Sequence, residues 1–316
     1  MMMPWVLSAL GLVILLLAGD ALVRGAVNLS LRIGIPALIV SLTIVAFGTS
    51  APELLISISA VLDDAPGIAL GNVVGSNTAN ILLVLGIPAM LSRLHTSECN
   101  TRKTYVLMLL ASVLFIGLAF WGTFTMVSGG ILLAALALVL GDMFRDALRH
   151  RQEGICEGDA DIEEADPNMP GWRIAVFLVL GLVGLPLGAS LLVENATVIA
   201  QSYGVSETVI GLTLVAVGTS LPELATTVMA ALRKQADVAL GNVIGSNMFN
   251  LLAIIGIASF VGPIPVDPEF LTFDLWVMLG ASLLIFPFVF LKYDIGRRWG
   301  IVLTLIYVGY VASILF

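Results

Sequence analysis

Residues 41–60 read SLTIVAFGTSAPELLISISA, and residues 211–230 read GLTLVAVGTSLPELATTVMA, with 11 of the 20 positions identical. A second pair of blocks keeps the same offset of 170 positions. ALGNVVGSNTANILLVLG at 69–86 and ALGNVIGSNMFNLLAIIG at 239–256 agree at 11 of 18 positions. Shared hydrophobicity alone would not match Gly, Thr, Ser, Pro, Glu and Asn in register. The chain is therefore an internal duplication.

The composition around these blocks is that of an integral membrane protein. The 316 residues are 59% hydrophobic and only 11% charged, with a mean hydropathy of +1.06, whereas soluble domains carry about 25% charged residues. Apolar segments of about 20 residues do not alternate in polarity, which predicts membrane-spanning helices and not barrel strands. The basic residues are too few for a nucleic-acid surface.

We therefore predict an all-α, polytopic membrane protein with ten transmembrane helices in two inverted five-helix repeats. Residues 1–147 form the first repeat, with its motif at 41–86, and residues 171–316 form the second, with its motif at 211–256. An acidic cytoplasmic linker, 148–170, joins them. The predicted spans are 5–27, 37–62, 69–92, 104–121, 126–147, 172–194, 207–232, 239–261, 271–291 and 298–316.

The basic residues indicate that the second repeat is inverted. Each repeat has an odd number of spans, so equivalent helices must cross the membrane in opposite directions. If the amino terminus is outside, all 14 Lys and Arg residues fall in the loops that follow the odd-numbered spans or at the span ends beside those loops. This is the bias that the positive-inside rule gives to cytoplasmic loops. We expect a multi-pass protein of the cell membrane with both termini extracellular.

The first repeated block supplies one membrane-embedded carboxylate in each repeat. Glu53 and Glu223 lie in otherwise uncharged segments, where a charged group costs about 2.5 kcal/mol or more. The preceding prolines, Pro52 and Pro222, break the helix and free backbone carbonyl oxygens. Three- and four-residue spacing then places carbonyl, hydroxyl and carboxylate oxygens on one stripe. The two stripes are Ala46, Thr49, Ser50 and Glu53, and Ala216, Thr219, Ser220 and Glu223.

The second block adds hydroxyl and amide groups at four-residue spacing, which places them on one helix face. These residues are Asn72, Ser76 and Asn80 in the first repeat and Asn242, Ser246 and Asn250 in the second. Glycines at small-xxx-small spacing accompany them and let helices approach closely. For these glycines, Asn72 and Asn242, helix packing explains the residues at least as well as ion binding does. Asn77 and Asn247 flank the stripe, and we expect packing or hydrogen bonding from both.

Together the blocks predict one site of oxygen ligands with two formal negative charges at the interface between inverted repeats. The stripes contain no His or Cys, so the chemistry suits hard cations such as Na+ and Ca2+ rather than Zn2+ or Cu+. Two facing carboxylates repel each other unless a cation or a proton lies between them. Such a site suits obligatory exchange. The alternative is that the glutamates only pack against kinked helices or cap them. This alternative is weakened because each repeat carries a glutamate at the equivalent position.

These paired motifs resemble the two alpha repeats of the Ca2+/cation antiporter superfamily, specifically the prokaryotic sodium/calcium exchangers. The resemblance rests on GTSAPE at 48–53 with GNVVGSNTAN at 71–80, and on GTSLPE at 218–223 with GNVIGSNMFN at 241–250. It implies an antiporter that exchanges Na+ for Ca2+ by alternating access, with spans 1 and 6 sliding past the ion-binding core. The cation ligands it implies are Glu53, Glu223, Thr49, Ser50, Thr219, Ser220, Ser76, Ser246, Asn80, Asn250, Ala46 and Ala216.

The resemblance also implies the subtype. Asn250 stands where potassium-dependent relatives carry Asp, which predicts K+-independent exchange, and unequal ion charges would make it electrogenic. The nearest alternative is a Ca2+/H+ antiporter, but such relatives tend to show G-N-A-x-E-L in place of G-T-S-x-P-E. A cation channel could use the same oxygens. The expected partners are Na+ and Ca2+ as substrates and the lipid bilayer, with no nucleic acid, no cofactor, no obligatory protein partner and no enzyme activity.

Overall fold

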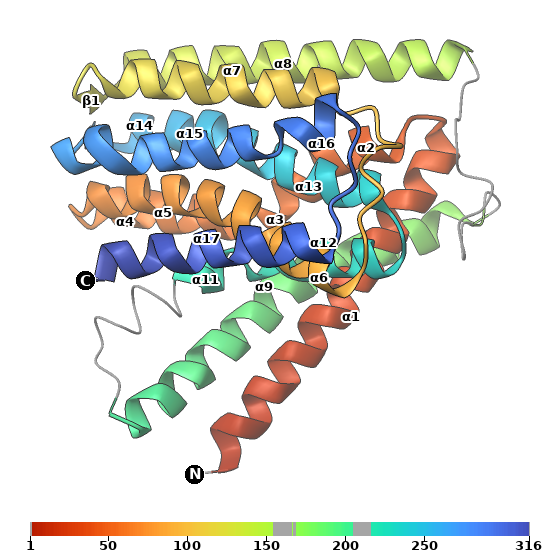
Figure 1. Ribbon diagram of the computed structural model, residues 1–316, viewed down its shortest axis with the longest axis horizontal. Helices are drawn as coiled ribbons and strands as arrows, with labels where there is room; N and C mark the ends of the chain where they lie inside the picture. Colours follow the sequence, from red (N-terminus) through yellow and green to blue (C-terminus); the bar gives the residue numbers. More distant parts are fainter. Residues whose placement is uncertain (1, 154–165, 167–168, 205–215, 316) are drawn as a thin grey trace.

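The computed structural model describes residues 2–153, 166, 169–204 and 216–315, and nearly all of them are helical (Figure 1). The first half comprises α1 (Met2–Ile33), α2 (Ala37–Val40), η1 (Ser41–Val45), α3 (Ala46–Thr49), α4 (Ala51–Leu62), α5 (Pro66–Ala79), η2 (Asn80–Val84), α6 (Gly86–Leu91), α7 (Arg102–Ala119), β1 (Thr123–Phe124) and α8 (Met126–Glu153). The second half comprises α9 (Gly171–Ser202), α11 (Ala216–Thr219), α12 (Leu221–Leu232), α13 (Ala236–Phe249), η5 (Asn250–Ile254), α14 (Ile255–Val261), β2 (Ile264–Pro265), η6 (Phe270–Asp274), α15 (Leu275–Leu284), α16 (Phe286–Phe290) and α17 (Arg297–Leu315).

Helix occupies each of the ten predicted spans. Within the described residues, seven helices are long and apolar enough to cross a membrane, and the bent pair 37–49 and 51–62 makes an eighth. The other two predicted spans, 207–232 and 298–316, include residues outside the described part of the chain. The ends differ from the prediction by a few residues, most at α9, which continues to Ser202. Most of the acidic linker lies outside the described residues.

Both motif helices are interrupted at the predicted place. Ser50 and Ser220 leave the helical conformation, with φ and ψ of −84° and 3° and of −86° and 5°. The following proline lies in the first turn of the next helix, where its missing N–H leaves no hydrogen bond unmade. The two pieces of the first motif helix meet at 41°. The second motif helices carry one π-helical turn each, at Asn80–Val84 and Asn250–Ile254.

Reciprocal contacts relate the two halves. Phe124 pairs with Ile264 between β1 and β2, and Leu94 forms an isolated bridge with Ile295. Leu94 corresponds to Ile264 at the offset of 170 positions, and Phe124 corresponds to Ile295 at an offset of 171, because the second repeat has one additional residue between them. The same exchange relates the close packing of α6 on α17 to that of α14 on α8. Exchanged contacts of this kind arise when duplicated halves are related by a two-fold axis, which is the arrangement of inverted repeats.

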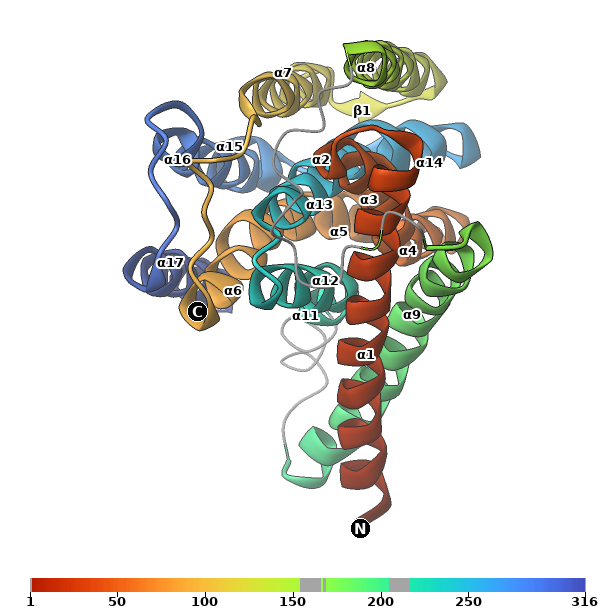
Figure 2. The same ribbon diagram turned by 90° about the vertical axis from the view of Figure 1, so that its right-hand side faces the viewer.

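Helices α1 and α9 form a pair that crosses the remaining helices at a slant (Figures 1 and 2). Small residues bring the two backbones together, because a Cβ atom on Gly11 would lie 2.7 Å from the nitrogen of Leu192. A Cβ atom on Gly188 would lie 2.9 Å from the nitrogen of Leu15. This is the small-residue packing that holds helices together in lipid. The other helices enclose the two motif regions.

Candidate cation site

The two glutamates lie in the first turns of α4 and α12, directly after the helix breaks. Glu53 is 1% exposed and Glu223 is fully buried. They are close enough that their charges repel when both are ionised. Among the described residues, no donor reaches either carboxylate oxygen of Glu53 or Oε2 of Glu223. Buried oxygens without a donor are costly, so these carboxylates require a cation or a proton.

Hydroxyl groups of the first repeat reach into the second. Ser50 Oγ donates to Oε1 of Glu223 at 3.2 Å. Thr49 Oγ1 donates to Oδ1 of Asn242 at 3.3 Å and lies 3.4 Å from Oγ of Ser246. All five residues except Asn242 belong to the predicted ligand set, and the structure brings them together from α3, the break that follows it, α12 and α13. The predicted convergence of the two repeats is therefore present around Glu223.

The predicted amide ligands use their nitrogens within the protein. Asn80 Nδ2 donates to Oδ1 of Asn247 at 3.1 Å, and Asn250 Nδ2 donates to Oγ of Ser76 at 3.0 Å. The side-chain oxygens of Asn80 and Asn250 are buried and receive no donor from the described residues. Each amide is thus oriented with its acceptor oxygen available. Both residues start a π-helical turn, a feature that often marks functional sites in helices.

The other four asparagines of the repeated motifs are structural supports. Asn72 Nδ2 donates to the carbonyl of Glu53 at 3.2 Å, and Asn242 Nδ2 donates to the carbonyl of Glu223 at 3.3 Å. Asn77 and Asn247 each donate to the other's carbonyl at 3.3 Å, which ties the two repeats together at their centre. The hydrogen-bonding role expected for Asn77 and Asn247 is confirmed.

Sequence reasoning missed two hydroxyls that take part in this support. Asn72 Nδ2 also donates to Ser57 Oγ, and Asn242 Nδ2 to Thr227 Oγ1, both at 3.1 Å. Ser57 and Thr227 are fully buried, four residues after each glutamate. That repeated four-residue spacing was the signal in the sequence that could have identified them.

The remaining predicted ligands are Ala46, Ser220, Thr219 and Ala216. Ala46 is buried, and its carbonyl accepts the N–H of Ser50 at 3.0 Å and the hydroxyl of Thr49 at 3.3 Å. Ser220 is buried, and its hydroxyl has no hydrogen-bond partner among the described residues. Thr219 is half-buried at the end of α11. Ala216 begins α11, and its side chain lies outside the described part.

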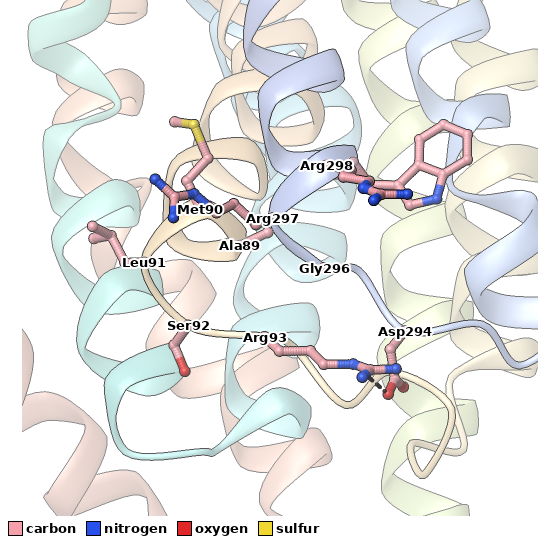
Figure 3. Close-up of a pocket in the computed structure, with 10 residues that line it drawn as sticks. Ala89, Met90, Leu91, Ser92, Arg93, Asp294, Gly296, Arg297 and Arg298 are labelled. Carbon is pink, nitrogen blue, oxygen red and sulfur yellow. Dashed lines mark ion pairs between the residues drawn. The ribbon is translucent and has the colours of Figure 1, made fainter.

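The chemistry of this cluster is that of a hard-cation site. Glu53 and Glu223 supply two carboxylates, and hydroxyl and amide oxygens supply the rest. Among the described residues, no three His, Cys, Asp or Glu side chains gather into a group that could hold a metal ion. A set of mostly neutral oxygens with few charges suits ions that must be released again rather than held permanently. A cavity of about 670 Å³ is lined by other residues, at the junction of α6 and α17 (Figure 3).

Comparisons with known proteins match the whole chain. The family model described as "Sodium/calcium exchanger protein" matches residues 3–142 and 173–316. The chain is 33% identical to the sodium/calcium exchanger MaX1 of Methanosarcina acetivorans, over 97% of both proteins. It is 35% identical to the inner membrane protein YrbG of Escherichia coli, over 90% of this chain and 88% of that protein. A solved structure of the sodium-calcium exchanger NCX_Mj, soaked with zero Na+ and Ca2+, superposes with a TM-score of 0.84 at 31% identity, over 98% of each chain.

Proposed function

Because the chain belongs to the sodium/calcium exchanger protein family, a family of membrane antiporters, we propose that it exchanges Na+ for Ca2+ by alternating access. The observation that carries the proposal is the pair of buried carboxylates at equivalent positions of two inverted repeats, with three oxygens that no described donor reaches. Such groups need a positive charge beside them at every stage of a transport cycle. A site that always holds a cation couples the exit of one ion to the entry of another.

The proposed ligands are Glu53 and Glu223, assisted by neutral oxygens around them. The hydroxyls of Ser50 and Thr49 support this role, because they lie beside Glu223. The available side-chain oxygens of Asn80 and Asn250 support it as well. The full proposed ligand set is Glu53, Glu223, Thr49, Ser50, Thr219, Ser220, Ser76, Ser246, Asn80, Asn250 and the carbonyls of Ala46 and Ala216.

The charge of the site bears on which ions are coupled. Two carboxylates neutralise one Ca2+ and leave no charge for an accompanying K+, and Asn250 adds only a dipole. Exchange should therefore proceed without K+. If more than two Na+ replace each Ca2+, every cycle moves net charge. We include electrogenic exchange in the proposal for this reason.

The α1–α9 pair is the element that we propose moves. Its helices pack closely on each other through glycines, so the pair can shift as one unit. Where α1 meets the core, a Cβ atom on Gly19 would lie 3.0 Å from the carbonyl oxygen of Ala225 on α12. A smooth contact of this kind lets one helix slide past another. The basic loops support a topology with both termini outside and residues 148–170 in the cytoplasm.

Competition between the two ions tests the shared site. Radioactive Ca2+ is bound to the purified protein in detergent while Na+ is raised at constant ionic strength, with choline as the control cation. We expect Na+ to displace Ca2+ and choline to leave it bound. Ca2+ binding that ignores Na+ but falls as the pH is lowered would favour the Ca2+/H+ antiporter instead.

A further inference from the structure

The cavity in Figure 3 lies where α6 ends and α17 begins. Residues 89–93 form one wall, and residues 294 and 296–299 form the other, around a volume of about 670 Å³. None of these residues belongs to the proposed cation site. The isolated bridge between Leu94 and Ile295 joins the two walls beside the cavity. The pocket is therefore a fixed part of the fold.

The pocket carries an excess of positive charge. Three arginines line it, and among the described residues only Arg93 has a carboxylate within ion-pair distance, Asp294, whose Oδ2 lies 3.1 Å from its Nε. Partial burial raises the pKa of Asp294, but hydrogen bonds from Ser97 and the charge of Arg93 outweigh this effect and hold the pKa below its usual value. Asp294 is thus ionised and already neutralised. Among the described residues, Arg297 and Arg298 have no carboxylate within ion-pair distance.

The inverted repeat shows that the fold does not need these arginines. With an offset of 170 before the strand bridges and of 171 after them, Arg93 matches Pro263, Arg297 matches Met126 and Arg298 matches Val127. The junction of α14 and α8 therefore closes with apolar residues at the positions where the junction of α6 and α17 has three cations. Packing alone does not explain the arginines, which lie on the predicted cytoplasmic side, where the positive-inside bias also places them.

The surroundings of the pocket are those of a lipid interface. Leu91 is 61% exposed and Trp299 is 46% exposed at its rim. The face of α17 that continues from the rim exposes Ile301 and Leu305, at 41% and 64%. In a membrane protein such apolar side chains contact acyl chains, and Trp prefers the level of the headgroups. The arginines therefore lie at headgroup depth, beside a surface for lipid tails.

We propose that this pocket binds the phosphate headgroup of an anionic phospholipid, with its acyl chains along the exposed face of α17. Guanidinium groups donate paired hydrogen bonds to phosphate oxygens, and basic pockets between membrane helices favour anionic headgroups. Arg297 and Arg298 supply the donors, while Arg93 stays paired with Asp294. Free phosphate would use the same arginines, but it would leave the apolar face without a role.

Fluorescence quenching by brominated lipid tests the proposal directly. Trp299 becomes the only tryptophan when the other four are replaced by Phe: Trp5, Trp121, Trp172 and Trp276. The protein is placed in phosphatidylcholine nanodiscs that contain a small fraction of brominated phosphatidylglycerol or brominated phosphatidylcholine. We expect phosphatidylglycerol to associate with the Trp299 site roughly fivefold or more above phosphatidylcholine.

Substitutions then test whether Arg297 and Arg298 cause the preference for phosphatidylglycerol. Arg297→Gln with Arg298→Gln should remove it, while Arg297→Lys with Arg298→Lys should retain most of it. Arg173→Gln, which removes a cation at the start of α9, is the matched control and should change nothing. Equal quenching by the two lipids in the unsubstituted site would overturn the proposal without any variant. If Arg173→Gln lost the preference for phosphatidylglycerol to the same extent, general surface charge would explain the preference and the pocket would not. If inorganic phosphate abolished the preference for phosphatidylglycerol, and chloride at the same ionic strength did not, the pocket would be a site for free phosphate instead.

Discussion

Glu53 and Glu223 occupy the same position in the two repeats but have different surroundings. Ser50 Oγ donates to Glu223 at 3.2 Å, whereas the equivalent hydroxyl, on Ser220, has no partner among the described residues. An inverted-repeat transporter that is open to one side cannot be symmetric, because its two halves adopt different conformations. Under the proposed alternating access, unequal hydrogen bonding of the two glutamates is expected.

Removing one charge from the site should stop transport. Glu53→Gln and Glu223→Gln keep the shape of the side chain, so the fold should survive. Each removes one of two charges that balance a divalent ion in a region of low dielectric constant. We expect Ca2+ uptake by either variant to fall at least tenfold in reconstituted vesicles. Glu194→Gln, an exposed position on α9, should transport normally. A folded Glu53 or Glu223 variant with normal uptake would remove that residue from the site.

At the scale of elements, glycine sets how closely α13 approaches the broken helix. A Cβ atom on Gly245 would lie 2.6 Å from both the Cβ of Ala46 and the carbonyl oxygen of Leu42. A backbone carbonyl cannot turn away as a flexible side chain can. The small-residue spacing in the sequence predicted such contacts. Here that contact aligns Ser246 with Thr49.

Gly245→Ala should push α13 away from α3 and disturb the cation site. We expect a loss of about 1–3 kcal/mol in stability, the usual effect of overpacking, together with reduced Ca2+ uptake. Gly280→Ala is the control, since no described atom lies within 4 Å of a Cβ there. Thermal unfolding in detergent compares the two. If Gly245→Ala melted and transported like the control, the close approach would not matter to the site.

The elements were predictable to different degrees. The breaks at Ser50 and Ser220 followed from Pro52 and Pro222, because a missing donor has the same effect in any context. The π-helical turn that begins at Asn80 was not predicted, since it depends on how neighbouring helices pack. The pairing of Asn80 with Asn247 and of Asn250 with Ser76 was not predicted either. Spacing places residues on one face of a helix, but it does not say which helix that face meets.

At the scale of the whole molecule, duplication explains both the fold and the site. Two copies of one five-helix unit meet at Asn77 and Asn247, whose amides bond to each other's backbone. Each copy contributes one carboxylate, so neither half alone could balance a divalent cation. The proposed membrane orientation rests on the basic loops, whose 14 Lys and Arg residues all lie on one predicted side.

Labelling in intact cells should find the linker inside. In a background without Cys99 and Cys156, Asp161→Cys should resist a membrane-impermeant thiol reagent until the cells are opened. Asp63→Cys, at the exposed end of α4, should react in intact cells. Reaction at position 161 in intact cells would reverse the proposed orientation.

Ion-gradient-driven uptake is the decisive test of the proposed exchange of Na+ for Ca2+. Radioactive Ca2+ uptake is measured in vesicles containing the purified chain, with Na+, H+ or K+ gradients imposed one at a time. The membrane potential is clamped with valinomycin and K+ in separate runs. We expect uptake to be driven by an outward Na+ gradient, without a requirement for K+ beside Ca2+. It should be faster when the interior is positive, because more than two Na+ leave for each Ca2+ in the proposed exchange. Uptake that follows a pH gradient and ignores Na+ would contradict it.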